Sequence, residues 1–382
     1  MTRIRLLVHS GPAVFRDHAE AWDDLLHRCG EPSFFLRSAW LRSWAEVFGE
    51  DHELFLLVAE RDGEWVAGIP LAQGLGRLGS RREVAKLEFA GAPYFDRMEI
   101  PATDHAARVD FLAEVLDWSR REREGWIALA LEELPRESGT LRALAELQDA
   151  GRLRYYTQLA SRAPLIELEA PEQRPNDRYL RKIRRNRAKL QQLGGVEIRL
   201  HRPEPGEVPT LVAEMSDVED RSWKGHQGVG VFRTGRPFEF FSRVWTESCA
   251  EGRILAATIR HEGELVAYHW GFLHGERYLA YNLAQLPGQD EFTAGLILLE
   301  EIVQGGGEHG FRVVDASRGS LDKQNFIGAY HGPVREHGHA TIYHPGARGQ
   351  AMRLLRHRVF PVARAVLGKP QPPALLMSRS GV

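Results

Sequence analysis

ERDGEWVAGIPLA (60–72) and RHEGELVAYHWGF (260–272) are two stretches of one chain that follow the same pattern. In each, an acidic residue followed by glycine, at 62–63 and at 262–263, stands between two apolar runs, and Val-Ala follows at the matching position. Glycine accepts the positive φ that a tight turn between antiparallel strands requires. The two stretches therefore predict two β-hairpins at equivalent places in the two halves of the chain.

The similarity between the halves extends beyond the hairpins. A run with helical spacing of apolar residues at 104–123 leads into WIALALEEL (126–134), and a second such run at 293–308 leads into FRVVDASRG (311–319). The repeated order of hairpin, helix and strand favours a duplicated module of the α/β class over coincidence. The alternative is two unrelated hairpins, because turns of the Glu-Gly-Glu type are common.

Bulk composition excludes several classes of protein. The 382 residues are 43% hydrophobic and 27% charged with a formal net charge of −2, which is typical of globular domains and excludes an overall nucleic-acid footprint. No apolar run reaches the roughly 18 residues of a membrane-spanning helix. Two cysteines, Cys29 and Cys249, indicate no disulfide framework. We therefore expect a cytoplasmic protein.

A change in composition near residue 170 indicates a domain boundary. The segment APEQRPND (170–177) has two prolines among charged residues, and we predict an N-terminal domain over 1–170 and a C-terminal domain over 171–345. The C-terminal domain begins with a basic helix over 177–193 that ends at two glycines. Residues 346–382 are predicted to form a C-terminal helix and tail.

The C-terminal helix, predicted over 346–368, mixes arginines with large apolar residues. Such a mixture is typical of helices that lie on a membrane surface, so peripheral membrane contact is one interpretation. Pro361 interrupts the helix, and docking on the protein's own surface is the simpler interpretation.

One candidate ligand site is the start of the helix at Thr293-Ala294-Gly295. A helix N-terminus presents unpaired N–H groups and the positive end of the helix dipole, and both attract phosphate. Thr293 can cap this helix, and Gly295 allows a ligand to approach the backbone closely. The alternative is an ordinary capped helix without a ligand.

A second candidate is the loop DASRGSLDKQNF (315–326), which directly follows an apolar strand. Asp315 could orient or deprotonate an amine. Arg318 and Lys323 could hold phosphate or stabilise an oxyanion. The alternative is a solvated loop with one surface ion pair.

Two further segments carry polar residues in distinctive arrangements. DRSWKGHQGVGVF (220–232) places Trp223 and Lys224 at a helix end before a glycine-rich loop, although Trp223 could equally be a core anchor. The helix over 177–190 places seven cations, including Arg181 and Arg185, within twelve residues. It could grip a phosphate-bearing ligand or RNA, or it could be a solvated helix paired with acids.

The histidines predict no metal site. None has a zinc-binding spacing with cysteine partners. His269 lies on a predicted strand, where it is either a satisfied sheet residue or a side chain that faces a cleft.

Four segments in a fixed order resemble a known group of proteins. They are RKIRRNRAKL (181–190), RSWKG (221–225), TAG (293–295) and DASRGSLDK (315–323). With them, the chain is similar to the tandem GNAT-fold acyltransferases of the CelD-like and FemAB-like group, most clearly over 175–330. The resemblance implies two GNAT-like domains, each with a mixed, mainly antiparallel twisted sheet flanked by helices.

The resemblance also implies an activity, an N-acyltransferase that moves an acyl group from acyl-coenzyme A to an amine on a small molecule or glycan, in envelope or polysaccharide biosynthesis. One alternative is a FemAB-like aminoacyltransferase that takes aminoacyl-tRNA through the basic helix. Another is a non-catalytic binding or scaffold protein. The expected catalytic residues are Asp315 and Lys323; those for the donor are Thr293, Ala294, Gly295 and Arg318; those for the substrate are Trp223, Lys224, Tyr281, His269, Arg181 and Arg185.

Overall fold

A computed structural model describes residues 4–78, 83–122, 125–319 and 326–361 of the chain. The chain forms two compact units. The N-terminal unit comprises Met1–Ser161 together with Glu336–Val382, and the C-terminal unit comprises Arg162–Arg335.

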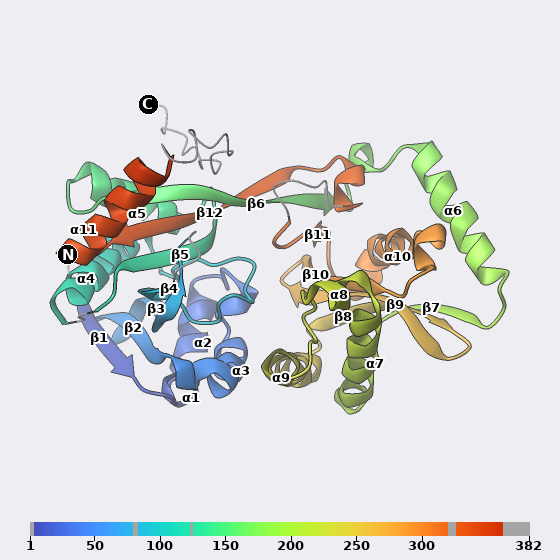
Figure 1. Cartoon of the computed structure of the whole chain (residues 1–382), viewed down its shortest axis with the longest axis horizontal. Coiled ribbons are helices and arrows are strands. Elements are labelled where there is room, and N and C mark those ends of the chain that lie inside the picture. The colour runs from blue at the N-terminus through green and yellow to red at the C-terminus, as the bar shows by residue number, and fades with distance from the viewer. Residues whose placement is uncertain (1–3, 79–82, 123–124, 320–325, 362–382) are drawn as a thin grey trace. The chain divides into compact units, whose positions relative to one another are not determined.

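The N-terminal unit is built on a mixed sheet in the order β1-β2-β3-β4-β5-β12 (Figure 1). The strands are β1 (Arg5–Ser10), β2 (Glu53–Arg61), β3 (Glu64–Arg77), β4 (Glu83–Phe89), β5 (Ala128–Pro135) and β12 (Val334–Tyr343). The pairings β1/β2, β2/β3, β3/β4 and β5/β12 are antiparallel, and β4 runs parallel to β5. Its helices are α1 (Val14–Asp17), α2 (Ala19–Arg28), α3 (Ser38–Phe48), α4 (His105–Glu122), α5 (Gly139–Asp149) and α11 (Ala347–Leu354).

The C-terminal unit has a sheet of the same kind, in the order β6-β11-β10-β9-β8-β7 (Figure 1). The strands are β6 (Tyr155–Glu167), β7 (Val196–His201), β8 (Ile254–His261), β9 (Glu264–His274), β10 (Arg277–Gln285) and β11 (Val313–Asp315). Only β10/β11 is parallel among the pairings described within this unit. Its helices are α6 (Asp177–Gln191), α7 (Val208–Arg221), α8 (Trp223–Gln227), α9 (Arg236–Ala250) and α10 (Ala294–His309).

Both predicted hairpins are present. β2 pairs with β3 and β8 pairs with β9, each antiparallel around the expected acidic-glycine turn. The turn residues have positive φ in both cases, 56° and 85° at 62–63 and 50° and 83° at 262–263. Two successive positive φ values match the right-handed twist of the strands that such a turn joins.

The two units repeat the same order of elements. In each, four strands are followed by a helix and a strand that pairs in parallel with the fourth: β4, α4 and β5 in one, and β10, α10 and β11 in the other. The helices bury the apolar faces that their sequences predict, for example Phe111 and Val115 in α4 and Leu299 and Ile302 in α10. The predicted fold class, two mixed and mainly antiparallel sheets with flanking helices, is confirmed.

The units differ from the predicted boundaries at the C-terminal end. The prediction ended the second domain at residue 345, but the chain from Glu336 onward belongs to the N-terminal unit. The reason is that β12 pairs with β5 of that unit, from His337 opposite Pro135 to Tyr343 opposite Ala128. This long-range pairing leaves no mark on the local sequence.

Two helical segments are irregular. The segment near the N-terminus is interrupted at His18, between α1 and α2. The C-terminal helix continues from α11 into a π-helical turn, η7 (Leu355–Val359), and the rest of the predicted helix and tail lies outside the described residues. No helix within the described part of the chain combines the length and the hydropathy needed to cross a bilayer.

Candidate functional site

The fourth strand of the C-terminal unit, β10, is irregular where the candidate site begins. Its pairing with β9 shifts between Ala280 and Asn282, so that Tyr281 is an extra residue. Its parallel pairing with β11 covers only three residues, from Arg277 to Leu279. A bulge of this kind re-aims side chains and is common beside active sites. Here it brings Tyr281 and Asn282 toward the aromatic and polar side chains described next.

Asn282 lies at the centre of a buried polar network between β10, β9 and α7. Its amide Nδ2 donates to Glu219 Oε1 at 2.6 Å and to the hydroxyl oxygen of Tyr268 at 3.1 Å. Its Oδ1 accepts from Lys224 Nζ. Glu219 is 1% exposed and also accepts from the backbone N–H of Phe232 at 2.7 Å. Asn282, Glu219 and Tyr268 are buried and Lys224 is half-buried, so these contacts fix one another.

Burial and charge in this network shift the pKa values of its members. Desolvation lowers the pKa of Lys224, and Glu219, whose Oε1 lies 3.8 Å from Lys224 Nζ, partly offsets that shift. Desolvation and then the nearby Lys224 charge lower the pKa of His269 to about 3. Desolvation raises the pKa of Tyr268 well above its ordinary value. At neutral pH, His269 and Tyr268 are therefore neutral, and Lys224 gives up its proton more readily than a lysine in water.

Trp223 and Lys224 point into different environments although they are neighbours. Ser222 caps α8 by accepting from the Lys224 backbone N–H at 3.1 Å. Lys224 turns into the network, whereas the Trp223 side chain is 58% exposed. The alternative that Trp223 is a core anchor is therefore wrong. Tyr281 packs with its ring centroid 5.0 Å from that of Trp270.

Sequence reasoning found Lys224, Tyr281 and His269 but missed Glu219 and Asn282. Both missed residues are polar in otherwise apolar surroundings, Glu219 on a buried face of α7 and Asn282 within the strand YLAYNLAQ. A polar residue at a position where the pattern predicts an apolar one was the signal that could have identified them. It does not reveal which residues meet, since they come from segments more than sixty residues apart.

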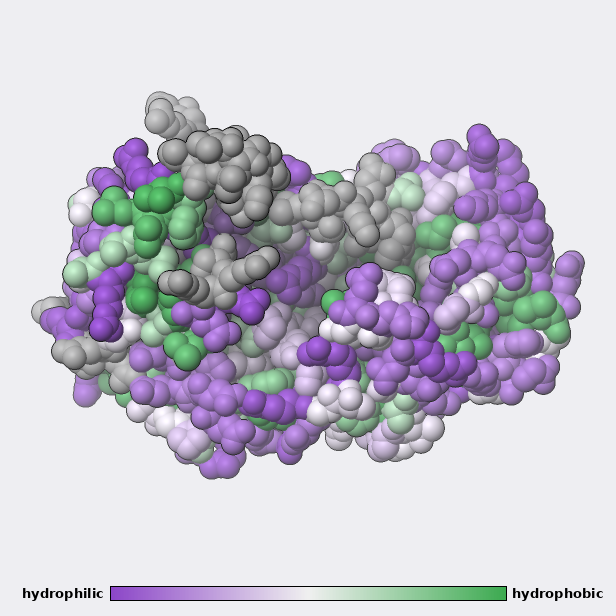
Figure 2. Space-filling model, viewed as in Figure 1, coloured by the Kyte–Doolittle hydropathy of each residue, from purple (hydrophilic) through white to green (hydrophobic). Residues whose placement is uncertain are grey.

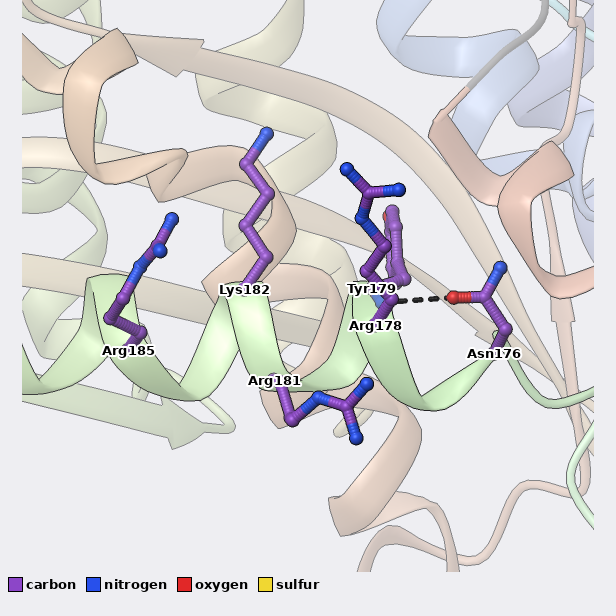
Figure 3. Close-up of a pocket in the computed structure, with 6 residues that line it drawn as sticks. All are labelled: Asn176, Arg178, Tyr179, Arg181, Lys182 and Arg185. Carbon is purple, nitrogen blue, oxygen red and sulfur yellow. Dashed lines mark hydrogen bonds between the residues drawn. The ribbon is translucent and has the colours of Figure 1, made fainter.

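The basic helix α6 lines a pocket of about 800 Å³. Its lining residues lie within one stretch of α6 and its cap: Asn176, Arg178, Tyr179, Arg181, Lys182 and Arg185. Figure 3 shows Arg178, Lys182 and Arg185 extended to one side of the helix, and Arg181 extended to the other. Asn176 caps the helix by accepting from the Tyr179 backbone N–H at 3.0 Å. Hydrophilic side chains dominate the surface over α6 in Figure 2.

Within the described part of the chain, most of the α6 cations have no acidic partner. Arg187 pairs with Glu301 of α10. Among the described residues, no carboxylate forms an ion pair with the other six cations of α6, Arg178, Arg181, Lys182, Arg184, Arg185 and Lys189. Their charge is therefore available to an anionic ligand. The alternative interpretation, a helix paired with acids, holds only for Arg187 among the described residues.

The same helix contacts the N-terminus of α10. Asn186 Nδ2 donates to Thr293 Oγ1 at 3.2 Å and lies 3.5 Å from the Glu291 carbonyl oxygen. The Gly295 backbone N–H donates to Gln285 Oε1 at 3.2 Å. The cationic helix and the positive end of the α10 dipole thus belong to one region of the unit.

The expected capping role of Thr293 is wrong. Its side chain makes no capping hydrogen bond, because φ of 54° and ψ of 46° place it in the left-handed region instead of the extended conformation of an N-cap. We expected a ligand to approach the backbone closely at Gly295. The space beside its Cα is instead limited by Leu283, since an added Cβ would lie 3.1 Å from a Leu283 methyl group. Ala294 is fully buried.

Asp315 is held as a buried ion-paired carboxylate. It is fully buried, and Arg335 Nη1 donates to its Oδ2 at 2.9 Å, while Arg277 lies 3.7 Å away. Its Oδ1 accepts from the Ser317 backbone N–H at 2.9 Å. Both carboxylate oxygens are therefore engaged by groups of the same unit. Arg318 is exposed next to this strand end.

Lys323 lies outside the described residues. Within the described part of the chain, no group of three or more His, Cys, Asp or Glu side chains is arranged to hold a metal ion.

Comparisons with known proteins agree with this architecture. Residues 177–325 match a family model described as an acetyltransferase (GNAT) domain. No curated protein matches the chain by sequence. Among solved structures, FemX is 12% identical with a TM-score of 0.54, covering 92% of this chain and 99% of its own. L-PGS from Bacillus licheniformis is 13% identical with a TM-score of 0.51, covering 90% of this chain and 96% of its own.

At these identities the solved structures establish the fold. The matched domain contains α6, the buried network and the α10 N-terminus. The N-terminal unit repeats the same order of strands and helix. Residues 177–325 thus match a GNAT acetyltransferase domain, and the chain as a whole shares its fold with FemX and L-PGS.

Proposed function

We propose that this protein is an N-acyltransferase that moves an acyl group from acyl-coenzyme A to an amine on a small molecule or glycan. In this reaction the amine nitrogen forms a bond to the acyl carbon, and the carbon–sulfur bond of the thioester breaks. The coenzyme leaves as the thiolate, and the amine gives up one proton. The protein therefore has to hold a phosphate-bearing donor and accept that proton.

The observation that carries the proposal is the contact between α6 and the α10 N-terminus. Asn186 joins the two helices at Thr293, and the cationic pocket lies on the same helix as Asn186. Arginine and lysine side chains with a helix N-terminus suit the phosphate groups of coenzyme A. A pocket of about 800 Å³ is within the size range of ligand sites.

Lys224 is the proposed proton acceptor in place of Asp315. Its lowered pKa makes it a better base at neutral pH than an ordinary lysine. The exposed Trp223 beside it offers an apolar surface to an incoming acceptor. Asp315 instead has a structural role, because two arginines hold its charge.

Three variants at one position test this role. Lys224→Met removes the amine, and we expect turnover to fall about 100-fold or more with the KM for acyl-coenzyme A little changed. Lys224→Arg keeps the positive charge but cannot release a proton, so we expect the same loss. Arg243→Met, which removes an exposed cation of α9, is the matched control. Full turnover in Lys224→Arg would assign a purely electrostatic role to the side chain.

A second candidate donor is aminoacyl-tRNA. It is favoured by the six α6 cations that have no carboxylate partner within the described residues. Neutralising Arg181 and Arg185 together should then weaken tRNA binding and reduce the steepness of its salt dependence by about two units. Arg243→Gln, an exposed arginine on α9, is the control. Acyl-coenzyme A turnover that is insensitive to both α6 changes would reject this donor.

Thermal stabilisation of the intact chain separates the candidates. Acyl-coenzyme A at about 100 times its dissociation constant stabilises a protein by about 2.7 kcal/mol. Stabilisation by acyl-coenzyme A but not by tRNA supports the first donor, and the reverse supports the second. Stabilisation by neither, together with absence of turnover, would point to a non-catalytic binding protein.

A further inference from the structure

The C-terminal helical segment of the N-terminal unit has an unusual distribution of side chains. Four large apolar residues on α11, η7 and the residue that follows are exposed, and we call them the apolar ridge: Leu354 (49%), Leu355 (40%), Val359 (50%) and Phe360 (39%). A helix that only docks on its own protein turns such residues inward. Figure 2 shows hydrophobic side chains at the surface over α11, at the upper left.

Other residues hold this segment against the unit. Met352 packs on a buried cluster that includes Tyr343 and Val84. Gly349 approaches the chain so closely that an added Cβ would lie 2.2 Å from the His344 carbonyl oxygen. The segment is therefore fixed by one face while the apolar ridge is left on the other.

A cationic pocket lies on the same segment. It has a volume of about 930 Å³, and its lining includes Arg154, Arg353 and Arg358, which we call the arginine pocket. Tyr156 and His357 also line it, with their rings stacked 3.7 Å apart. Arg353 Nη1 donates to the Tyr156 hydroxyl oxygen at 3.1 Å, so this wall is fixed.

The positive charge of the pocket is not neutralised. Among the described residues, no carboxylate forms an ion pair with Arg154, Arg353 or Arg358, and no acidic side chain lines the pocket. Burial, and then the charges of Arg356 and Arg353, lower the pKa of His357 to about 4. A neutral imidazole beside several arginines indicates a positive potential that suits a phosphate group.

We propose that this face of the N-terminal unit docks on an anionic phospholipid membrane. The arginine pocket takes the phosphate of a lipid headgroup, and the apolar ridge enters the headgroup region beside it. The partner is a lipid surface and not a free phosphate compound, because an apolar surface adjoins the phosphate pocket on one helical segment. Arginines combined with leucine and phenylalanine are the composition of interfacial helices.

Vesicle co-sedimentation tests the proposal without donor or acceptor, so its outcome is independent of the proposed transfer activity. We expect the intact chain to bind vesicles of phosphatidylcholine mixed with phosphatidylglycerol, and to bind phosphatidylcholine alone much more weakly. Each arginine near an anionic surface strengthens binding about fivefold. Arg154→Gln with Arg358→Gln should therefore weaken binding about 25-fold, and Arg16→Gln, an exposed arginine on α1, should not.

A test variant and a matched control variant examine the apolar ridge. Leu354→Ser with Leu355→Ser should weaken binding about tenfold or more, since partial burial of each leucine in the interface is lost. Leu75→Ser is the control, because Leu75 is 70% exposed on β3 of the same unit. The side chains changed in the test variants are Leu354, Leu355, Arg154 and Arg358, and all four are exposed. We therefore expect the variants to fold, and circular dichroism checks this.

Three results would overturn the proposal. One is absence of vesicle binding by the intact chain. Another is equal binding to both vesicle types, which removes any role for the arginine pocket. The third is thermal stabilisation by inorganic phosphate without vesicle binding, which would make the pocket a site for a free phosphate compound.

Discussion

Replacing Asn282 with leucine removes the centre of the buried network of the C-terminal unit. The change keeps the side-chain size but deletes the contacts to Glu219 at 2.6 Å, to Tyr268 at 3.1 Å and to Lys224. A buried polar group left without its partner costs about 1–3 kcal/mol, and more when the group is charged. In the variant, Glu219 still accepts from the Phe232 N–H, and Lys224 still has Glu219 at 3.8 Å. We therefore expect the free energy of unfolding to fall by about 3–4 kcal/mol.

Urea unfolding and thermal melting of the full chain measure this loss. For a unit of this size, about 3–4 kcal/mol corresponds to a fall in Tm of roughly 10 °C. Asn186→Leu is the matched control, because Asn186 is also buried, at 4% exposure, but its partners are neutral: the Thr293 hydroxyl at 3.2 Å and the Glu291 backbone carbonyl at 3.5 Å. We expect about 1 kcal/mol for the control.

A double variant shows whether the penalty comes from unpaired charge. In Lys224→Met with Asn282→Leu, no buried ammonium group is left without its amide partner. The double variant should then be more stable than the sum of the two single losses by about 1–3 kcal/mol. Additive losses, or an Asn282→Leu loss no larger than that of Asn186→Leu, would refute the reasoning.

The other predictions concern charge and backbone. Burial lowers the pKa of Lys224 below 10.5 in the folded protein. Between that lowered pKa and 10.5 the unfolded chain binds more protons than the folded chain, so the free energy of unfolding rises with pH. Lys224→Met should lack this rise. Arg335→Met should cost about 3–5 kcal/mol, since it leaves Asp315 buried beside a weaker partner. Gly263→Ala should cost about 1 kcal/mol because φ is 83°, whereas Gly307→Ala, in α10 with open space around it, should stabilise by about 0.5–1 kcal/mol.

Urea titrations at several pH values measure all of these free energies. Parallel pH profiles of the wild type and Lys224→Met would show that Lys224 has an ordinary pKa in the folded protein. Arg335→Lys retains a charge and should lose less than Arg335→Met; equal losses would assign the effect to packing. Gly263→Ala and Gly307→Ala are each other's control, and effects of the same sign would contradict the backbone argument.

The sequence by itself determined the features that depend on neighbouring residues. Asp62-Gly63 and Glu262-Gly263 specify their turns because few residues other than glycine accept the φ of the second position. The spacing of Phe111 and Val115 predicts α4, and that of Leu299 and Ile302 predicts α10, because a helix buries every third or fourth residue. The order of these local elements was enough to predict the fold class.

Only the tertiary structure decided which polar residues meet. Asn282 of β10 meets Glu219 of α7 and Lys224 of α8, which lie 63 and 58 residues before it in the chain, and no local pattern couples positions so far apart. The same is true of Asp315, which the sequence suggested as a base and which the fold buries against Arg335. A residue's partners set its pKa and its exposure, and long-range packing chooses those partners.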